Sequence, residues 1–221
     1  MKLVTRLFII IIISAGMISC GQSKSKKIAL VPAMSKEELS KHSQATFAGG
    51  CFWCEETVFE SVKGVKEAIS GYAGGTEQNP TYEEVGRGGT GHAETVNIYY
   101  DSTEVSYATL LKVYFASEDP TQVNGQGPDE GTQYRSIVFY RNDEEKSEAE
   151  NYIKELNASK KYDGPIAAQV MPFVKFWDAE DYHQNYIVNN PDVPYVRMES
   201  SPRIRRFQKQ FPELLKPDHE F

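Results

Sequence analysis

The chain has 221 residues, of which 40% are hydrophobic, and this is enough for one domain with a sizeable core. Its formal net charge is -7 at pH 7. Phosphate binding requires a concentrated basic surface, so this charge gives no reason to expect a nucleic-acid partner. Length, composition and charge therefore indicate a globular protein whose function lies in a local site.

The N-terminal residues have the pattern of an export signal. A basic start precedes the apolar residues 7–13, which are too few to match the roughly 20 residues that span a bilayer. Residues 17–21 resemble a bacterial lipoprotein cleavage site, in which Cys20 becomes the lipid-carrying first residue of the mature protein. We therefore expect a signal peptide over residues 1–19 and an exported, membrane-anchored protein on the periplasmic or cell-surface side. An ordinary secretory signal and an uncleaved anchor are the alternatives.

The central part of the chain predicts one α+β domain over residues 43–200. Short apolar or alternating runs predict strands, and apolar residues at helical spacing predict helices. Strands are expected at 44–48, 65–72, 94–100, 136–140 and 167–171, and helices at 52–63, 106–117, 142–160 and 180–188. This order suits a two-layer ferredoxin-like sandwich, with helices packed against a mainly antiparallel sheet.

Two polar segments flank this domain. Residues 20–42 have little apolar periodicity and predict a tether between the membrane and the domain. Residues 201–221 form a C-terminal extension, in which 201–215 predict an exposed amphipathic helix. Its basic residues are Arg203, Arg205, Arg206 and Lys209. A membrane-surface or partner-binding patch is the functional alternative for this helix.

The number of cysteines is informative. The chain has three, and if Cys20 carries lipid, only Cys51 and Cys54 remain. A bridge across such a short loop constrains the unfolded chain too little to serve as a structural staple. Redox chemistry is the better explanation for this pair.

The segment Gly49-Gly50-Cys51 places a cysteine where a strand turns into a helix. The unpaired N–H groups and the positive dipole end at a helix start favour a thiolate, which is the nucleophilic form. Phe52 and Trp53 then predict an apolar wall beside this cysteine. The alternative is an inert buried cysteine beside two core aromatics. Cys54 lies one helical turn from Cys51, close enough for a disulfide if the first turn frays.

Four ordered motifs carry a resemblance to a known family. They are Gly50 to Cys54, Gly91-His92-Ala93-Glu94, the run from Asp129 to Ser136, and the run from Ala179 to Gln184. Together with Tyr82, they resemble the peptide-methionine (S)-S-oxide reductases, also called A-type methionine sulfoxide reductases. The resemblance extends from about Ala45 to Tyr195.

The resemblance implies a specific reaction at Cys51. This residue would attack the sulfur of methionine sulfoxide, in free, peptide-bound or protein-bound form, and Glu94 would supply the proton to the oxygen. Glu94 must be protonated for this role, and burial against Trp53 would raise its pKa. The cellular role implied for an exported enzyme of this kind is the repair of oxidised proteins.

The same resemblance assigns the surrounding residues. Tyr82 and Tyr134 would hydrogen-bond the sulfoxide oxygen, and Asp129 would support the polar network. Phe52 and Trp53 would hold the methyl group. An ordinary surface carboxylate at position 94 and core tyrosines at 82 and 134 are the alternatives.

One departure from the family pattern concerns recycling of the enzyme. Many relatives have a cysteine in the C-terminal run, where this chain has Val196, and no cysteine follows it. Cys54 is then the only intramolecular candidate to condense with oxidised Cys51. We therefore expect a Cys51–Cys54 disulfide that a thioredoxin-like protein reduces.

A metal or a cofactor is not expected. His92 and His183 are far apart in the sequence, unlike the closely paired ligands of zinc sites. His183 is expected to be a structural hydrogen-bonding residue of its helix.

Two other functions remain open at this point. A thioredoxin-like disulfide oxidoreductase is suggested by the spacing of Cys51 and Cys54, and a non-catalytic lipoprotein binding module by the aromatic residues. Neither alternative accounts for the four ordered motifs.

Overall fold

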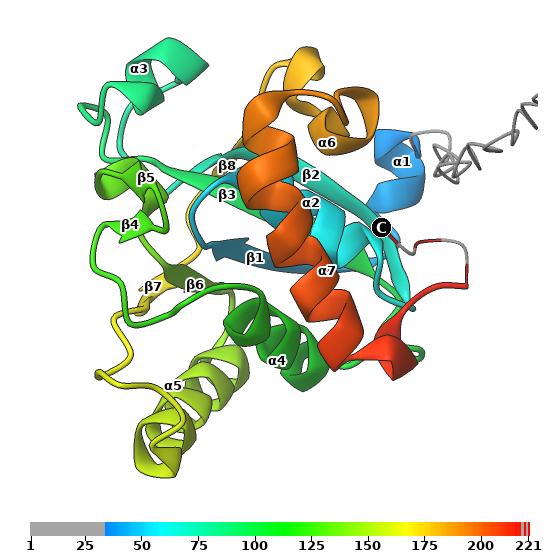
Figure 1. Ribbon diagram of the computed structural model, residues 1–221, viewed down its shortest axis with the longest axis vertical. Coiled ribbons are helices and arrows are strands. Elements are labelled where there is room, and N and C mark those ends of the chain that lie inside the picture. Colours follow the sequence, from blue (N-terminus) through cyan, green and yellow to red (C-terminus); the bar gives the residue numbers. More distant parts are fainter. Residues whose placement is uncertain (1–33, 218, 220) are drawn as a thin grey trace, which may run out of the picture.

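A mixed six-stranded sheet forms the centre of the computed structural model, which describes residues 34–217, 219 and 221 (Figure 1). Its strand order is β7-β6-β1-β3-β2-β8, where only β6 and β7 are parallel. The strands are β1 (Ser43–Ala48), β2 (Val65–Ala73), β3 (Ala93–Tyr100), β6 (Ile137–Tyr140), β7 (Gln169–Pro172) and β8 (Phe176–Asp178). The predicted signal peptide and Cys20 lie outside the described residues.

Helices of the chain surround this sheet. They are α1 (Lys36–Leu39), α2 (Phe52–Glu60), α3 (Tyr82–Gly86), α4 (Tyr107–Ser117), α5 (Asp143–Ser159), α6 (Tyr186–Asn189) and α7 (Ser201–Gln210). Figure 1 shows α7 crossing in front of α2, and α2, α4 and α7 contact one another. A small hairpin of β4 (Gly125–Gln126) and β5 (Asp129–Glu130) lies apart from the main sheet.

Stacked aromatic rings fix α2 and α4 relative to the sheet. The Phe47 ring on β1 stacks on Phe59 of α2, with 5.6 Å between ring centroids, and on Tyr114 of α4 at 4.9 Å. The Tyr114 hydroxyl donates to the carbonyl of Ala48 at 2.7 Å. Burial of three aromatic side chains is a large stabilising contribution, so the turn between β1 and α2 is firmly anchored.

The expected α+β class and the mainly antiparallel sheet are confirmed. All five predicted strands occur close to their expected positions, as do the helices α2, α4 and α5. The sequence did not predict α1, which lies inside the expected tether, nor α3, β8 and the β4–β5 hairpin.

The helix expected over residues 180–188 is wrong. A short 3-10 turn (Asp181–His183) is followed by the four-residue α6. Asn185 between them has a left-handed backbone, with φ 54°, and its N–H donates to the buried Glu56 carboxylate. A left-handed residue interrupts a right-handed helix, which explains the break.

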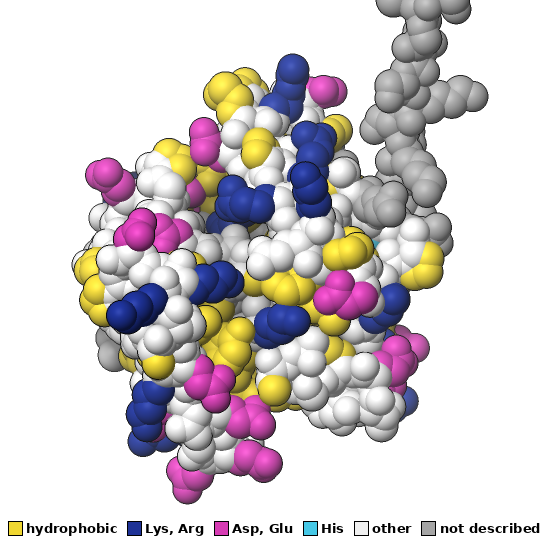
Figure 2. All heavy atoms as spheres, turned by 60° about the horizontal axis from the view of Figure 1, so that its bottom comes forward, with side chains coloured by type: hydrophobic (Ala, Val, Ile, Leu, Met, Phe, Trp, Pro, Cys, Tyr) yellow, Lys and Arg dark blue, Asp and Glu magenta, His cyan; other side chains and the backbone are white. Residues whose placement is uncertain are grey.

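The expectation of an exposed C-terminal helix is also wrong for one side of α7. Ile204 and Phe207 are buried, and the Arg203 side chain is enclosed, whereas Arg205 and Arg206 are exposed. Figure 2 displays one face of the molecule, on which basic and acidic side chains are interspersed. Among the described residues, no helix is long and apolar enough to cross a bilayer.

Candidate active site

The turn between β1 and α2 places Cys51 at the first position before the helix. Gly50 has a φ of +81°, and a Cβ there would lie 2.5 Å from the Cβ of Gln126. Only glycine accepts both the left-handed backbone and the close approach. Cys51 has an extended backbone as the N-cap of α2, and its side chain is buried.

Cys51 and Cys54 are free thiols hydrogen-bonded to each other. Burial raises the pKa of Cys51 well above its usual range, and the hydrogen bond with Cys54 and the charge of Glu94 act in the same direction. The expected thiolate at Cys51 is therefore wrong for this reduced form. The hydrogen bond from Cys51 lowers the pKa of Cys54 to about 7 instead, against the effect of burial.

Glu94 lies near the start of β3 and is 3% exposed. Its Oε2 accepts a hydrogen bond from the backbone N–H of Phe52 at 3.1 Å, which brings the carboxyl next to Cys51. Burial raises the pKa of Glu94 to about 8, and the charge of Asp129 adds to the effect. Burial therefore shifts the pKa of this carboxyl in the expected direction, although the group bonded to it is the Phe52 backbone.

Two tyrosine hydroxyls face the same space. Tyr82 opens α3, and its ring lies parallel to that of Phe52 with 6.4 Å between centroids. Burial, followed by the charges of Glu94 and Cys51, raises the pKa of Tyr82 to about 12. Tyr134 ends a 3-10 turn, and its pKa is raised by burial and then by Glu94 and Tyr82. Both hydroxyls therefore stay protonated as donors near Cys51.

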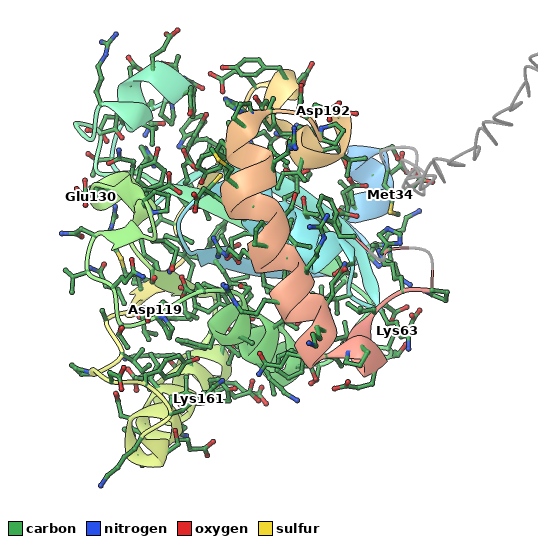
Figure 3. All side chains as sticks on the ribbon, viewed as in Figure 1. Met34, Lys63, Asp119, Glu130, Lys161 and Asp192 are labelled. Carbon is green, nitrogen blue, oxygen red and sulfur yellow. The ribbon has the colours of Figure 1, made fainter. Side chains whose placement is uncertain are left out.

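Asp129 enters from the β4–β5 hairpin, which lies at the edge of the molecule where Figure 3 labels Glu130. Its Oδ2 accepts a hydrogen bond from the Tyr195 hydroxyl at 2.5 Å. Its charge raises the pKa values of Cys51 and Glu94, so it belongs to the same cluster. The residues predicted to surround the nucleophile are thus brought together.

Trp53 forms one wall of the site. Its ring stacks on Tyr186, with 3.7 Å between centroids and 10° between planes. Its Nε1–H donates to Nδ1 of His183 at 3.0 Å. His183 is a hydrogen-bonding residue, as expected, but it lies in the 3-10 turn and holds an active-site side chain. The rings of Phe52 and Tyr195 also lie near Trp53, so this wall is rigid.

The sequence missed several residues that support the site. Glu180 accepts from the Tyr82 backbone N–H at 3.0 Å and from the Tyr72 hydroxyl at 2.9 Å, and so ties α3 to β2. Glu180 lies in the motif that ends at Gln184, and Tyr195 lies in the C-terminal run of the family pattern, so both positions carried a signal. Arg203 carried none, because its helix has the composition of a solvent-exposed one.

The two histidines lie in different networks. His92 accepts from the backbone N–H of Gly75 at 3.1 Å, while its other ring nitrogen lies 2.9 Å from the carbonyl oxygen of Glu77. His183 contacts Trp53 and lies 3.9 Å from Glu180. Within residues 34–217 and the two described residues beyond them, no three His, Cys, Asp or Glu side chains are grouped to hold a metal ion.

A broad hollow of about 520 Å³ adjoins the site at Asp129. The loop over residues 122–132 lines it, and the side chain of Val123 there is 76% exposed. The hollow therefore offers apolar and polar contacts directly beside the cluster.

Replacing His183 with Phe is expected to destabilise the protein by about 1–3 kcal/mol, because the Trp53 N–H loses its buried acceptor. The measurement is urea unfolding followed by Trp53 fluorescence in a Trp177→Phe background, since the chain has two tryptophans. Tyr182→Phe is the matched control, because Tyr182 is adjacent and 61% exposed. Equal stabilities of the two variants would contradict the assigned hydrogen bond.

The fold and the site together define an enzyme that uses a buried cysteine pair beside a protonated carboxyl group. Residues 43–215 match the family model described as peptide methionine sulfoxide reductase. The chain therefore belongs to the peptide methionine sulfoxide reductase (MsrA) family of enzymes, which reduce methionine sulfoxide.

Individual relatives agree with this assignment. Peptide methionine sulfoxide reductase MsrA 2 of Synechocystis is 48% identical over 78% of this chain and 81% of its own length. MsrA of Haloquadratum walsbyi is 47% identical over 77% of this chain and 97% of its own. The structure of methionine sulfoxide reductase A of Corynebacterium diphtheriae superimposes with a TM-score of 0.61 and 34% identity, covering 67% of this chain and 74% of that one.

Proposed function

We propose that Cys51 attacks the sulfur of methionine-S-sulfoxide while Glu94 gives its proton to the sulfoxide oxygen. The observation that carries this proposal is the Glu94 carboxyl, which is bonded to Phe52 N–H beside Cys51 and has a pKa of about 8. The oxygen ends on Cys51 as a sulfenic acid, and methionine leaves. A protonated acid of this kind typically accelerates such a step by about 10²- to 10⁴-fold.

The surrounding side chains give the substrate its orientation. The hydroxyls of Tyr82 and Tyr134 are donors for the oxygen, and Asp129 supports their polar network through Tyr195. Phe52 and Trp53 hold the methyl group, since aromatic faces suit a small apolar substituent. As the sulfur of Cys51 attacks, negative charge builds up on the sulfoxide oxygen, so these donors favour the transition state over the bound substrate.

The experiment that tests this proposal uses the two epimers of a methionine sulfoxide peptide separately, with dithiothreitol as reductant. We expect reduction of the S epimer and none of the R epimer. If the S epimer is not reduced, or if both are reduced equally, the proposed substrate is wrong.

For recycling, we propose that Cys54 condenses with the sulfenic acid of Cys51, which releases water and forms a disulfide. The two thiols are already hydrogen-bonded, and Val196 gives no third thiol in the C-terminal run. A thioredoxin-like dithiol then reduces the disulfide.

Replacing Cys54 with Ser is therefore expected to leave single turnover near the wild-type rate while thioredoxin-coupled turnover falls by about tenfold or more, because the slower intermolecular reaction must replace condensation. The two rates are measured by methionine formation and by consumption of the dithiol. Unchanged coupled turnover in Cys54→Ser would contradict the resolving role.

Protein-bound methionine sulfoxide is the proposed substrate in the cell. Support comes from the hollow of about 520 Å³ beside Asp129, which could receive flanking residues of an oxidised protein and is lined by a residue of the site. The cellular function would then be repair of oxidised exported proteins.

We also propose that the enzyme is a lipoprotein anchored through Cys20, with a cleaved signal over residues 1–19 and a tether over 20–42. Support comes from the basic start, the short apolar stretch and the cleavage-site pattern. Cells supplied with labelled palmitate are expected to label the chain and to retain it in the membrane fraction. If Cys20→Ser is still labelled and still found in the membrane fraction, the proposed anchor is wrong.

Finally, we propose a ferredoxin-like core for the fold. The four strands β6, β1, β3 and β2 are neighbours in that order and antiparallel, and α2 and α4 connect them in a β-α-β-β-α-β sequence. The strands β7 and β8 would then be additions at the two edges.

A further inference from the structure

Arg203 is a buried cation placed against the segment that carries both cysteines. Its Nη2 donates to the carbonyl of Gly49 at 3.0 Å and to the Glu55 carboxylate, and its Nε donates to the carbonyl of Ser117 at 2.6 Å. Gly49 and Glu55 lie on either side of the Cys51–Cys54 segment. The guanidinium from α7 therefore holds this segment at both of its ends.

The guanidinium keeps its charge, because Glu55, Cys54 and Glu118 raise the pKa of Arg203 against the opposing effect of burial. Burial also raises the pKa of Glu55 to about 8 and that of Glu118 to about 7. At neutral pH these acids are partly protonated, so a share of the positive charge remains to act on the nearby sulfurs.

Cys54 is the sulfur that gains from this charge. The hydrogen bond from Cys51 is the largest effect that lowers the pKa of Cys54. The charge of Arg203 and the Ser200 hydroxyl lower this pKa further. Ser200 is fully buried, and its hydroxyl has no hydrogen-bond partner in the described part of the chain, so it is free to turn toward a thiolate at Cys54. The acids that oppose ionisation of Cys54 are Glu55, Glu94 and Asp129.

We propose that Arg203 is a positioning residue for recycling, which stabilises the thiolate that leaves at Cys54 when a dithiol opens the Cys51–Cys54 disulfide. This inference rests on the proposed disulfide. A reductant thiolate attacks Sγ of Cys51, a new intermolecular disulfide forms, and the electron pair of the broken bond goes to Sγ of Cys54. The second thiolate of the reductant then attacks the reductant sulfur of the intermolecular disulfide. Cys51 leaves as a thiolate and takes up a proton, and the reductant becomes a disulfide.

The direction of attack follows from the surroundings of the two sulfurs. Cys51 is 5% exposed and Cys54 is 2% exposed, and Cys54 lies beside Ser200 of the turn Val196–Ser200. In the intermolecular disulfide Cys51 has no thiol proton to give, so its hydrogen bond to Cys54 is lost. Arg203 and Ser200 are then the groups left to stabilise the leaving thiolate, and a thiol with a lower pKa leaves faster.

The fork shape of the side chain matters as well as its charge. Arginine can bind two carbonyls and a carboxylate at fixed angles, whereas lysine is a flexible point charge. Arg203→Lys is therefore expected to retain part of the effect on Cys54, and Arg203→Met to lose it.

The test measures the pKa of Cys54 by thiolate absorbance in the full chain. The absorbance of Cys51→Ala minus that of Cys51→Ala/Cys54→Ser isolates Cys54. Arg203→Met is expected to raise this pKa, and Arg203→Lys to raise it less, because lysine keeps the charge but not the fork. A role confined to packing would move neither value in this pattern.

A second measurement follows reduction of the preformed Cys51–Cys54 disulfide by dithiothreitol. Arg203→Met is expected to slow it by roughly three- to tenfold, as a leaving thiol of higher pKa departs more slowly. Arg203→Met combined with Glu55→Gln removes both buried charges and serves if the single variant does not fold.

An unchanged Cys54 pKa and an unchanged reduction rate in a folded Arg203→Met chain would overturn the inference. Failure of the proposed disulfide gives a different result: wild type would then keep the Cys54 thiol after single turnover, while the pKa measurement would still report on Arg203.

Discussion

Replacing Glu94 with Gln is expected to lower the single-turnover rate of methionine sulfoxide reduction by about 10²- to 10⁴-fold. The glutamine Oε1 can still accept the Phe52 N–H, so the local structure is retained. The acidic proton is lost, and the sulfoxide oxygen receives none as Cys51 attacks. Rapid-quench measurement of methionine formed by reduced enzyme gives the rate.

The pH dependence provides the control for this assignment. Below about 8 the Glu94 carboxyl is protonated, and above it the proton is lost, so the ratio of the wild-type to the Glu94→Gln rate should fall as pH rises through about 8. The ratio removes most of the opposite trend due to ionisation of Cys51. The Glu94 charge that forms above about 8 opposes this ionisation in wild type alone, so it lowers the ratio further. Glu83→Gln, an exposed carboxylate beside Tyr82, should show the wild-type profile. A ratio independent of pH would contradict Glu94 as the acid.

Replacing Glu56 with Gln is expected to stabilise the protein in alkaline solution. Glu56 of α2 is 2% exposed and bonds to the Ser70 hydroxyl and to Asn185 N–H. Burial raises its pKa from 4.5 to about 8. The folded chain therefore holds this proton more tightly than the unfolded chain, and the associated stability is complete below pH 4.5 and lost as pH rises to about 8.

The amide that replaces the Glu56 carboxyl cannot ionise, so the variant does not lose this stability. We compare the free energy of unfolding of Glu56→Gln with that of wild type. The difference in favour of the variant should be larger at about pH 9 than at about pH 5, by on the order of 4 kcal/mol. Urea unfolding at the two pH values measures it. Glu155→Gln is the matched control because Glu155 is an exposed residue of α5. Equal pH dependence in both variants would contradict the raised pKa of Glu56.

The sequence predicted the strands well because they follow from local patterns. The alternation of apolar residues in 94–100 and the apolar run in 136–140 mark β3 and β6 directly. Glu94, Tyr82 and Tyr134 could be named because each lies in a short motif of the family. Their meeting around Cys51 depends on strand pairing, which the structure supplies.

Two errors have a common cause, since a single long-range contact outweighed the local pattern. The run 180–188 has helical spacing, but the Asn185 N–H bonds to Glu56, far away in the chain. Arg203 lies in a helix whose composition is typical of the surface, but Glu55 and the carbonyl of Gly49 give this side chain partners inside the protein. Sequence periodicity contains no information about such partners.

The expectation of a thiolate at Cys51 was wrong because burial has a larger effect on the pKa than the helix start. A helix start favours an anion by about 0.3–1 kcal/mol, whereas burial of a charged group can shift a pKa by several units, each worth about 1.4 kcal/mol. Cys51 is 5% exposed, so burial wins. Protonation of Glu94 removes one of the nearby charges that oppose ionisation of Cys51.

The central claim is that Cys51 takes the sulfoxide oxygen and that Cys54 then releases it as water. The most direct test mixes the reduced full chain with an S-epimer methionine sulfoxide peptide in the absence of reductant, and measures methionine and free thiols together. We predict methionine equal to the enzyme present and the loss of both the Cys51 and Cys54 thiols, with no methionine from Cys51→Ser. Methionine formation by Cys51→Ser, or by wild type with the Cys54 thiol retained, would contradict the account.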